Sequence, residues 1–271
     1  MKYADLHVHT TESDGTFTPT RLVQAALKCS LAAIAIVDHD TVGGVAEAKA
    51  AAVGTDLEII PGLELTAQNE NQEIHILGYF LDYQNQSLLE KLKLVQQNRV
   101  ERVYKIVNNL KDLGLTLNPQ AVFDISGPGT VGRMHIAKAL LQEGLVASTA
   151  EAFRKYIGDK SPAYVLGFRF SPAEAIALIN QAGGVAVLAH PYMLHNDALI
   201  PEFAGYGLQG IEVYYPEHSQ AMINFYLDLA KKFNLLVTGG SDFHGAVKPD
   251  IKLGMIKLPW ELVEKLRQEK R

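Results

Sequence analysis

The start of the chain carries two histidines separated by one residue, His7 and His9, with a carboxylate, Asp14, shortly after them. In an extended strand every second side chain lies on the same face, so the two imidazoles can converge on one centre. Two neutral imidazoles beside a carboxylate suit Zn, Mn, Fe or Ni better than Ca, which prefers an all-oxygen shell. Taken alone, the pair also fits a strand with two incidental polar residues, so the rest of the chain has to decide.

Further residues of metal-binding type follow at regular places. Six of the nine histidines and three carboxylates fall at, or within a few residues of, the carboxyl ends of the expected strands. Parallel α/β folds assemble their sites at that edge. One ion takes about four to six ligands including water, so nine ligands predict two or three metal ions. The candidate metal ligands are His7, His9, Asp14, His39, Glu64, His75, His190, Asp242 and His244.

Strands and helices in alternation must position these residues. Continuous apolar runs, such as residues 31–37 and 185–189, are typical of parallel strands covered on both faces. About seven strands separated by helices predict a barrel or a wound sheet with parallel strands. The first expected strand ends near His9. The other expected strands span residues 31–37, 57–66, 73–79, 185–189, 207–215 and 235–238. The expected helices cover residues 19–30, 42–52, 172–182, 218–233 and 259–269.

The alternation stops after about residue 82. Residues 87–113 form one long helical pattern, and shorter helical patterns follow over residues 132–142 and 149–156. The alternation returns at Ser171, which with Glu174 forms a capping-box pattern at the start of a helix. We therefore expect an α/β barrel of residues 1–82 and 167–271, and a helical insertion of residues 83–166 that acts as a substrate cap.

Composition limits the partners and the compartment. The chain has 271 residues, is 48% hydrophobic and carries a net charge of -5. It has enough apolar residues for a full core, but it lacks the basic character that binds long duplex nucleic acid. Neither a signal sequence nor a stretch of about 18 uncharged apolar residues is visible, so no membrane association is expected. The single Cys29, expected as a buried or half-buried thiol in a helix, excludes an internal disulfide and favours the cytoplasm.

As an ordered set, these motifs resemble those of the PHP (polymerase and histidinol phosphatase) domain family. Their order and spacing are most similar to the stand-alone subfamily of nucleotide phosphatases and 5'-phosphate-dependent RNA trimming enzymes. The resemblance covers nearly the whole chain and implies a distorted, TIM-like (β/α)7 barrel with a trinuclear metal centre at the strand ends. The matching motifs are His7-x-His9, Asp14, Val-Asp-His-Asp at residues 37–40, the Glu64 and His75 pair, His190-Pro191, and Gly-Ser-Asp-Phe-His at residues 240–244.

The resemblance also implies how the ligands are shared. It assigns His7, His9, Glu64 and Asp242 to one metal, Glu64, His75 and His190 to a second, and Asp14, His39 and His244 to a third. Similar proteins use mostly Mn, and Fe, Zn and Mg are the alternatives, because ligand type alone does not choose among the transition metals. Asp5, Asp38 and Asp40 are expected to support the ligands or cap helices rather than bind metal.

A phosphate site is expected where the helix over residues 132–142 begins. Free backbone N–H groups, Arg133 and His135 gather at this positive helix terminus. The resembling phosphatases carry an Arg-x-His step in a helical insertion, where it grips a phosphate of the nucleotide; a solvated helix start is the alternative. Relatives often have an arginine shortly after His190-Pro191, where this chain has His195, which either replaces that phosphate contact or lies in a surface loop.

Together, these features predict a metal-dependent phosphoesterase. The expected substrates are a nucleoside 3',5'-bisphosphate, a 5'-phosphorylated oligoribonucleotide, or both. Metal-activated hydroxide would attack phosphorus, so no nucleophilic side chain is required. His218 is a candidate general acid, with a cap, a substrate-rim contact or a plain surface position as alternatives. A histidinol phosphatase, another small-molecule phosphatase and a non-catalytic metal-binding domain are the competing hypotheses.

Overall fold

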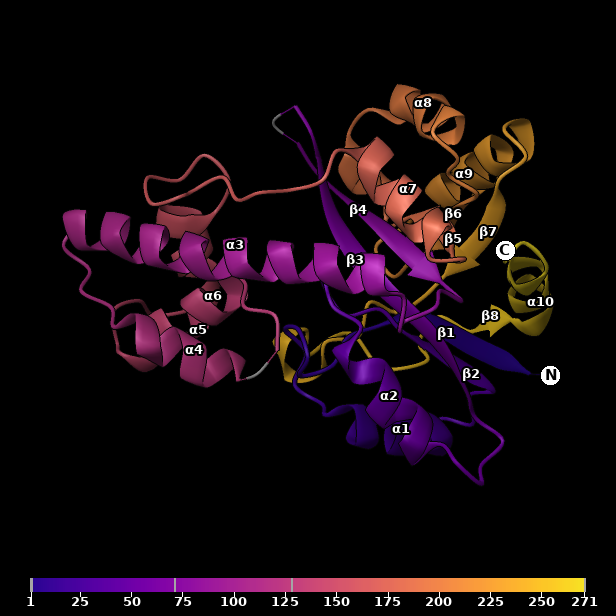
Figure 1. Cartoon of the computed structure of the whole chain (residues 1–271), viewed down its shortest axis with the longest axis horizontal. Coiled ribbons are helices and arrows are strands. Elements are labelled where there is room, and N and C mark those ends of the chain that lie inside the picture. Colours follow the sequence, from indigo (N-terminus) through magenta and orange to yellow (C-terminus); the bar gives the residue numbers. More distant parts are fainter. Residues whose placement is uncertain (1, 71, 128, 271) are drawn as a thin grey trace. The chain divides into compact units, whose positions relative to one another are not determined.

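The computed structural model describes residues 2–70, 72–127 and 129–270, and the chain divides into two compact units (Figure 1). The first unit, the barrel unit, consists of Met1–Glu90 and Arg169–Arg271, and the second, the helical unit, of Lys91–Phe168. In the part of the chain that the structure describes, no helix is both long and apolar enough to cross a membrane.

Within the described residues, an eight-stranded sheet forms the centre of the barrel unit. The strand order is β7-β6-β5-β4-β3-β2-β1-β8. A parallel bridge between Val8 and Phe243 joins β1 to the segment that follows β7, so the sheet is nearly closed into a barrel. The strands are β1 (Tyr3–Val8), β2 (Ala33–Ile36), β3 (Glu58–Asn69), β4 (Gln72–Tyr79), β5 (Val185–Leu188), β6 (Gly210–Tyr214), β7 (Leu236–Gly239) and β8 (Leu258–Pro259).

The sheet is mixed, so the expectation of parallel strands separated by helices was wrong in part. β4 runs antiparallel to both β3 and β5, and the unexpected short strand β8 runs antiparallel to β1. The other neighbouring strands are parallel. β3 ends at Asn69 and β4 begins at Gln72. So short a connection makes an antiparallel hairpin, because a parallel crossover needs a dozen or more residues.

Helices cover the sheet, and local signals mark where they begin. At α1, Thr18 accepts the N–H of Arg21 and Pro19 occupies the first turn. At α7, Ser171 and Glu174 form the expected capping box. Cys29 is the C-cap of α1 and is exposed, so the half-buried helical thiol was not found. The helices are α1 (Pro19–Lys28), α2 (Gly43–Ala51), α7 (Pro172–Gln181), α8 (Ile200–Gly205), α9 (Gln220–Lys232) and α10 (Trp260–Gln268), and the short turns are η2 (Pro191–Leu194), η3 (Asp197–Leu199) and η4 (Gly245–Val247).

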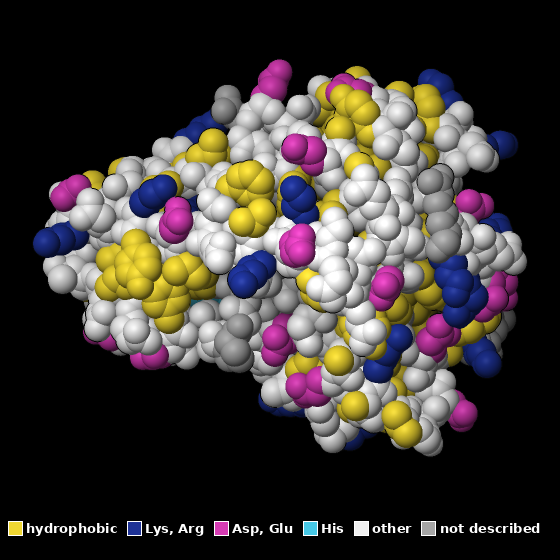
Figure 2. All heavy atoms as spheres, in the orientation of Figure 1, with side chains coloured by type: hydrophobic (Ala, Val, Ile, Leu, Met, Phe, Trp, Pro, Cys, Tyr) yellow, Lys and Arg dark blue, Asp and Glu magenta, His cyan; other side chains and the backbone are white. Residues whose placement is uncertain are grey.

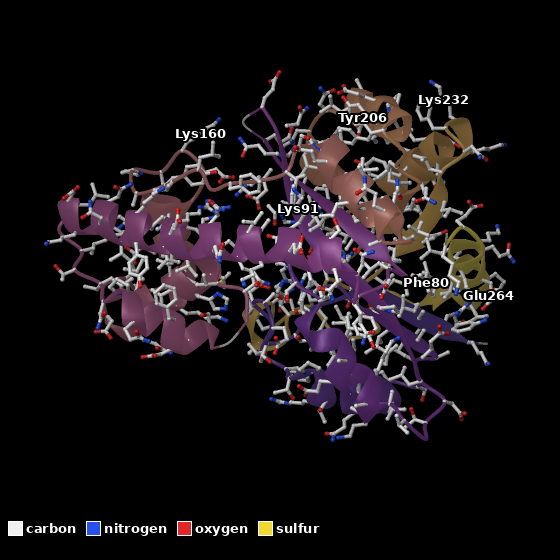
Figure 3. All side chains as sticks on the ribbon, viewed as in Figure 1. Phe80, Lys91, Lys160, Tyr206, Lys232 and Glu264 are labelled. Atoms are coloured by element: carbon white, nitrogen blue, oxygen red, sulfur yellow. The ribbon has the colours of Figure 1, made fainter. Side chains whose placement is uncertain are left out.

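Alternation along β1 separates the core from the site. Ala4 and Leu6 belong to a hydrophobic cluster that includes Val263 and Leu266 of α10. The intervening side chains of β1, including His7, therefore lie on its other face. Arg267 secures α10 by donating two hydrogen bonds to Glu58 of β3, at 2.8 and 2.7 Å. Phe80 and Glu264, labelled in Figure 3, also contact this arginine.

The helical unit has a hydrophobic core of its own. α3 (Gln86–Asp112) begins in the barrel unit and continues into the helical unit, where α4 (Pro119–Ser126), α5 (Arg133–Gln142), α6 (Thr149–Ala152) and η1 (Phe153–Ile157) follow. Ile106 and Leu110 of α3 pack in one cluster with Ile136 and Leu140 of α5. Hydrophobic side chains also gather on the surface over α3 and α4, while Lys, Arg, Asp and Glu are interspersed over the same face (Figure 2).

Candidate metal centre

Five of the candidate imidazoles converge on the carboxylate of Glu64. Oε2 of Glu64 lies near His7, His9 and His39, and Oε1 lies near His75 and His190. Two oxygens that face different sets of imidazoles are placed as in a carboxylate that bridges two cations. The distances from Oε2 are 3.3 Å to His7 Nε2, 3.2 Å to His9 Nε2 and 3.4 Å to His39 Nδ1, and those from Oε1 are 2.8 Å to His75 Nδ1 and 3.1 Å to His190 Nε2.

The loop after β7 completes the cluster. Asp242 Oδ1 lies 3.4 Å from His9 Nε2, and Asp14 Oδ1 lies 3.1 Å from His244 Nε2. Nδ1 of His244 donates to the backbone carbonyl of Asp242 at 2.9 Å, and this bond turns Nε2 of the same ring toward Asp14. The rings of His9 and His244 stack with their centroids 4.1 Å apart. Residues from opposite ends of the chain therefore meet in one site.

The ligating atoms form four overlapping groups. Within each group these atoms lie within 4.8 Å of one another, and each of the nine residues belongs to at least one group. The groups are His9, Asp14, His39 and His244; His7, Glu64 and His190; His7, His9 and Asp242; and His39, Glu64 and His75. His7, His9, His39 and Glu64 each belong to two groups, so the four groups adjoin one another.

Strand direction explains how His75 reaches the site. His75 pairs with Thr66 in the first half of β4, so the expectation that it closes a strand was wrong. Because β4 is antiparallel, its beginning lies at the edge where β3 ends. The backbone turns sharply where two other ligands enter, since His190 and Asp242 have φ of 26° and 55°, a region that non-glycine residues rarely adopt.

Several buried atoms of the cluster have no hydrogen-bond partner within the described residues. They are His9 Nδ1 and Nε2, His39 Nδ1, His75 Nδ1, His190 Nδ1 and Asp14 Oδ1. Buried polar atoms are nearly always hydrogen-bonded, because an unpaired one loses its hydration without replacement. Imidazole and carboxylate donors suit a transition metal, which would satisfy these atoms. The residues present therefore fit a group of bound divalent cations.

Carboxylates determine the protonation of the imidazoles when no metal is bound. Burial opposes charge on His9, but Asp242 and Glu64 outweigh burial and raise its pKa to about 9. Burial likewise opposes charge on His75, yet Glu64 and Glu73 raise its pKa to about 10. Burial dominates at His39 and lowers its pKa to about 3. Entering metal ions must therefore displace protons from some of the imidazoles.

Glu212 of β6 supports the site and was missed by the sequence analysis. It is fully buried, and its Oε1 lies 2.9 Å from Nδ1 of His7. A carboxylate accepts this hydrogen bond from Nδ1–H, so Nε2 is the nitrogen of His7 that faces the centre. Oε2 of Glu212 accepts the backbone N–H of His190 at 2.9 Å. A glutamate within an otherwise apolar strand was the available signal, since glutamate is rarely buried without a partner.

Asp5, Asp38 and Asp40 hold the loops that carry the ligands. This role confirms that they support the site, although through backbone and hydroxyl groups rather than imidazoles. Asp5 accepts the N–H groups of Ser241 and Gly254 at 2.8 Å each, Asp38 accepts the N–H of Thr10 and the hydroxyl of Ser13 at 2.7 Å each, and Asp40 accepts the N–H of Thr66 at 2.9 Å.

Two further groups contact the other oxygen of Asp242. The hydroxyl of Tyr215 donates to Oδ2 at 2.7 Å, and Nζ of Lys248 lies 2.5 Å from the same atom. Neither contact with Asp242 was expected from the sequence. Tyr215 follows β6 and Lys248 follows η4, and nothing in the spacing of the motifs shows that these segments meet.

The two remaining candidates in the barrel unit differ in burial. His218 is buried, so the plain surface position was wrong. Its Nδ1 donates to the carbonyl of Val213 at 2.8 Å, and burial lowers its pKa. His195 is exposed and follows η2 with a φ of 52°.

Arg133 and His135 lie in the helical unit, at the start of α5. Nδ1 of His135 accepts the N–H of Gly132 at 3.0 Å and so caps the helix. Nη1 of Arg133 donates to Asp159 at 2.7 Å, and its guanidinium lies 5.3 Å from the ring centroid of Tyr164. Both side chains thus gather at the positive helix terminus, as expected, but each already has a protein partner.

A nearly closed α/β barrel with imidazoles and carboxylates gathered at one rim defines a fold of metal-dependent phosphoesterases. The PHP domain family matches residues 5–188, and the chain belongs to this family. The 3',5'-nucleoside bisphosphate phosphatase of Chromobacterium violaceum is 34% identical over 254 residues, which cover 90% of this chain and 88% of that protein. The 5'-3' exoribonuclease Rnm of Escherichia coli is 34% identical over 257 residues, which cover 92% and 87% of the two chains.

A solved structure agrees with this assignment. The crystal structure of a predicted metal-dependent phosphoesterase from Bifidobacterium adolescentis superposes with a TM-score of 0.92 at 32% identity. The match covers 100% of this chain and 97% of that chain. The family resemblance found in the sequence is therefore confirmed.

Proposed function

We propose that this protein is a metal-dependent phosphoesterase that hydrolyses a phosphate ester of a nucleoside 3',5'-bisphosphate, trims 5'-phosphorylated oligoribonucleotides, or both. The observation that carries the proposal is the convergence of nine imidazole and carboxylate side chains, Glu64 among them, in one cluster. Two relatives support the substrate class, since one is named for bisphosphorylated nucleosides and the other for RNA. The single Cys29 supports the cytoplasm as its compartment.

The nine residues are proposed to hold two or three divalent ions, with Mn expected first and Fe, Zn or Mg as alternatives. Glu64 would bridge two ions through its separate oxygens. Such ions, when bound, lower the pKa of a bound water toward about 7 and neutralise charge on phosphoryl oxygens. A nucleophilic side chain is therefore not needed.

Other residues of the chain keep the ligands in the required state. Glu212 accepts from Nδ1 of His7, so Nε2 is the nitrogen that would bind a cation once its own proton is displaced. Asp5 and Asp38 fix the loops that carry Asp242 and Asp14. Because these carboxylates are buried and bonded, the ligands are positioned before any cation enters.

For the substrate phosphate we retain Arg133, His135 and His195 as proposed contacts, and the helical unit as a proposed substrate cap. For this role the ion pair of Arg133 with Asp159 must open; Asp159 is mostly exposed, whereas the side chain of Arg133 is 16% exposed. His218 would act as the general acid only when protonated, and its lowered pKa makes that form scarce at neutral pH.

The proposal is tested by elemental analysis of protein purified without chelators, combined with assays on nucleoside 3',5'-bisphosphates, 5'-phosphorylated RNA and histidinol phosphate. We expect about two or three metal ions per chain and turnover of a nucleotide or RNA substrate. Preference for histidinol phosphate would show that the enzyme is a histidinol phosphatase and not a nucleotide or RNA phosphoesterase. Bound metal without turnover of any phosphate ester would indicate a non-catalytic metal-binding domain.

The variants Asp14→Ala and His244→Ala should abolish turnover and leave the fold intact. Both side chains lie at one end of a complete barrel, where their loss removes ligands rather than core packing. Circular dichroism and metal content check the two parts of this expectation. Asp228→Ala on the exposed face of α9 is the matched control. Normal turnover by either variant, after metal removal and readdition, would contradict the site assignment.

A further inference from the structure

Lys248 brings an ammonium group to the edge of the metal centre. Its Nζ lies 2.5 Å from Oδ2 of Asp242, while its side chain is 38% exposed. An ordinary lysine is protonated at neutral pH, and here its ammonium group pairs with the carboxylate of Asp242. The group is therefore a permanent cation that faces both the carboxylates of the centre and solvent.

Lys248 is not required to hold Asp242 in place. The hydroxyl of Tyr215 donates to the same Oδ2 at 2.7 Å, and Tyr215 is only 5% exposed. Its ring contacts His190 and His218, with centroid distances of 5.5 and 5.4 Å. A rigid, buried hydroxyl thus fixes the carboxylate, and the flexible lysine duplicates that contact from the exposed side.

A duplicated contact leaves the lysine free for a second partner. Divalent cations among the nine ligands would repel the ammonium group, and an anion placed between them would relieve that repulsion. A phosphoryl group presents several oxygens that accept charge-assisted hydrogen bonds. The four-carbon stem of lysine allows Nζ to turn from Asp242 to such an oxygen.

From this geometry we propose that Lys248 is a catalytic residue that contacts the phosphoryl group of the substrate. The inference rests on the proposed phosphoesterase function and adds a substrate contact from the loop that follows the Asp242 and His244 motif. Tyr215 is, in contrast, a positioning residue that acts through Asp242. The two residues therefore predict different defects when they are changed.

The test measures binding of inorganic phosphate to metal-loaded protein by calorimetry, together with metal content and steady-state kinetics. Lys248→Met should keep the wild-type metal content while the Kd for phosphate rises about 10- to 100-fold, the loss expected for one charged hydrogen bond. KM should rise more than kcat falls, and Lys248→Arg should recover most of the binding. Lys252→Met, an exposed lysine of the same loop, is the matched control and should behave as wild type.

Two results would overturn the inference. Phosphate binding by Lys248→Met at wild-type affinity would show that the lysine does not contact the anion. Loss of metal from Lys248→Met would show that the lysine only positions Asp242, which is the role proposed for Tyr215. If the wild-type protein itself bound no metal and hydrolysed no phosphate ester, the proposed function would fail first, so the two failures are distinguishable.

Discussion

Replacing Glu212 by glutamine tests how the barrel prepares the metal centre. The substitution keeps the shape of the side chain but replaces one acceptor oxygen with an NH2 donor. In the structure both oxygens accept, Oε1 from Nδ1 of His7 at 2.9 Å and Oε2 from the N–H of His190 at 2.9 Å. The amide can satisfy only one of these donors. If the NH2 group of the glutamine faces His7, Nδ1 can no longer donate to this side chain. The imidazole proton can then reside on Nε2, where it blocks metal binding.

The expected loss can be estimated from the role of Glu212. Loss of a carboxylate that orients a metal-bound imidazole typically lowers metal affinity by about 10- to 100-fold, which corresponds to about 1.4–2.8 kcal/mol. Competition titration against a chromogenic chelator measures this change directly. Glu202→Gln, an exposed glutamate of α8, is the control. Wild-type metal affinity in a folded Glu212→Gln protein would refute the reasoning.

Three further predictions concern protons, cations and buried carboxylates. Metal affinity should rise with pH between 6 and 8, by up to about tenfold per pH unit for each proton displaced, because the pKa values of His9 and His75 are raised to about 9 and 10. Calorimetry in buffers of different ionisation enthalpy counts the displaced protons. Metal binding that does not depend on pH would contradict this prediction. The same two histidines stabilise the metal-free fold, and this contribution is complete below the unfolded pKa near 6.5 and is lost as pH rises through about 9 and 10. The Tm of metal-free protein should therefore fall over that pH range. Saturating metal should restore the Tm. Asp5→Ala should destabilise metal-free protein by about 2–4 kcal/mol, since it leaves buried N–H and hydroxyl donors unpaired; urea unfolding measures the loss, and a change as small as that of Asp228→Ala would count against it.

The sequence predicted the convergence of the nine residues because strand periodicity and strand ends are local properties. His7 and His9 share a face of β1 through the two-residue period, and His39 follows a buried strand that the apolar run makes visible. The direction of β4 was not predicted, since its apolar pattern is the same in either direction. The short connection to β3 carried that information and was overlooked.

The supporting residues were harder to predict than the ligands. Tyr215 and Lys248 meet at Asp242 only because separate segments pack side by side, and neither belongs to a recognisable motif. Glu212 could have been suspected as an acidic residue in a buried strand, but its partner could not. Burial of His218 was missed for the same reason, because its neighbour Tyr192 comes from a separate segment of the chain.

The β3–β4 hairpin has a consequence for the order in which the protein assembles. Glu64 and His75 stand on adjacent arms of this hairpin, so their contact closes only a short loop of chain. The bridge between Val8 and Phe243 instead joins the two ends of the sequence, which is the slowest type of contact to form. We therefore expect refolding chains to acquire a nascent, weak cation-binding pair early and full affinity only when the barrel closes.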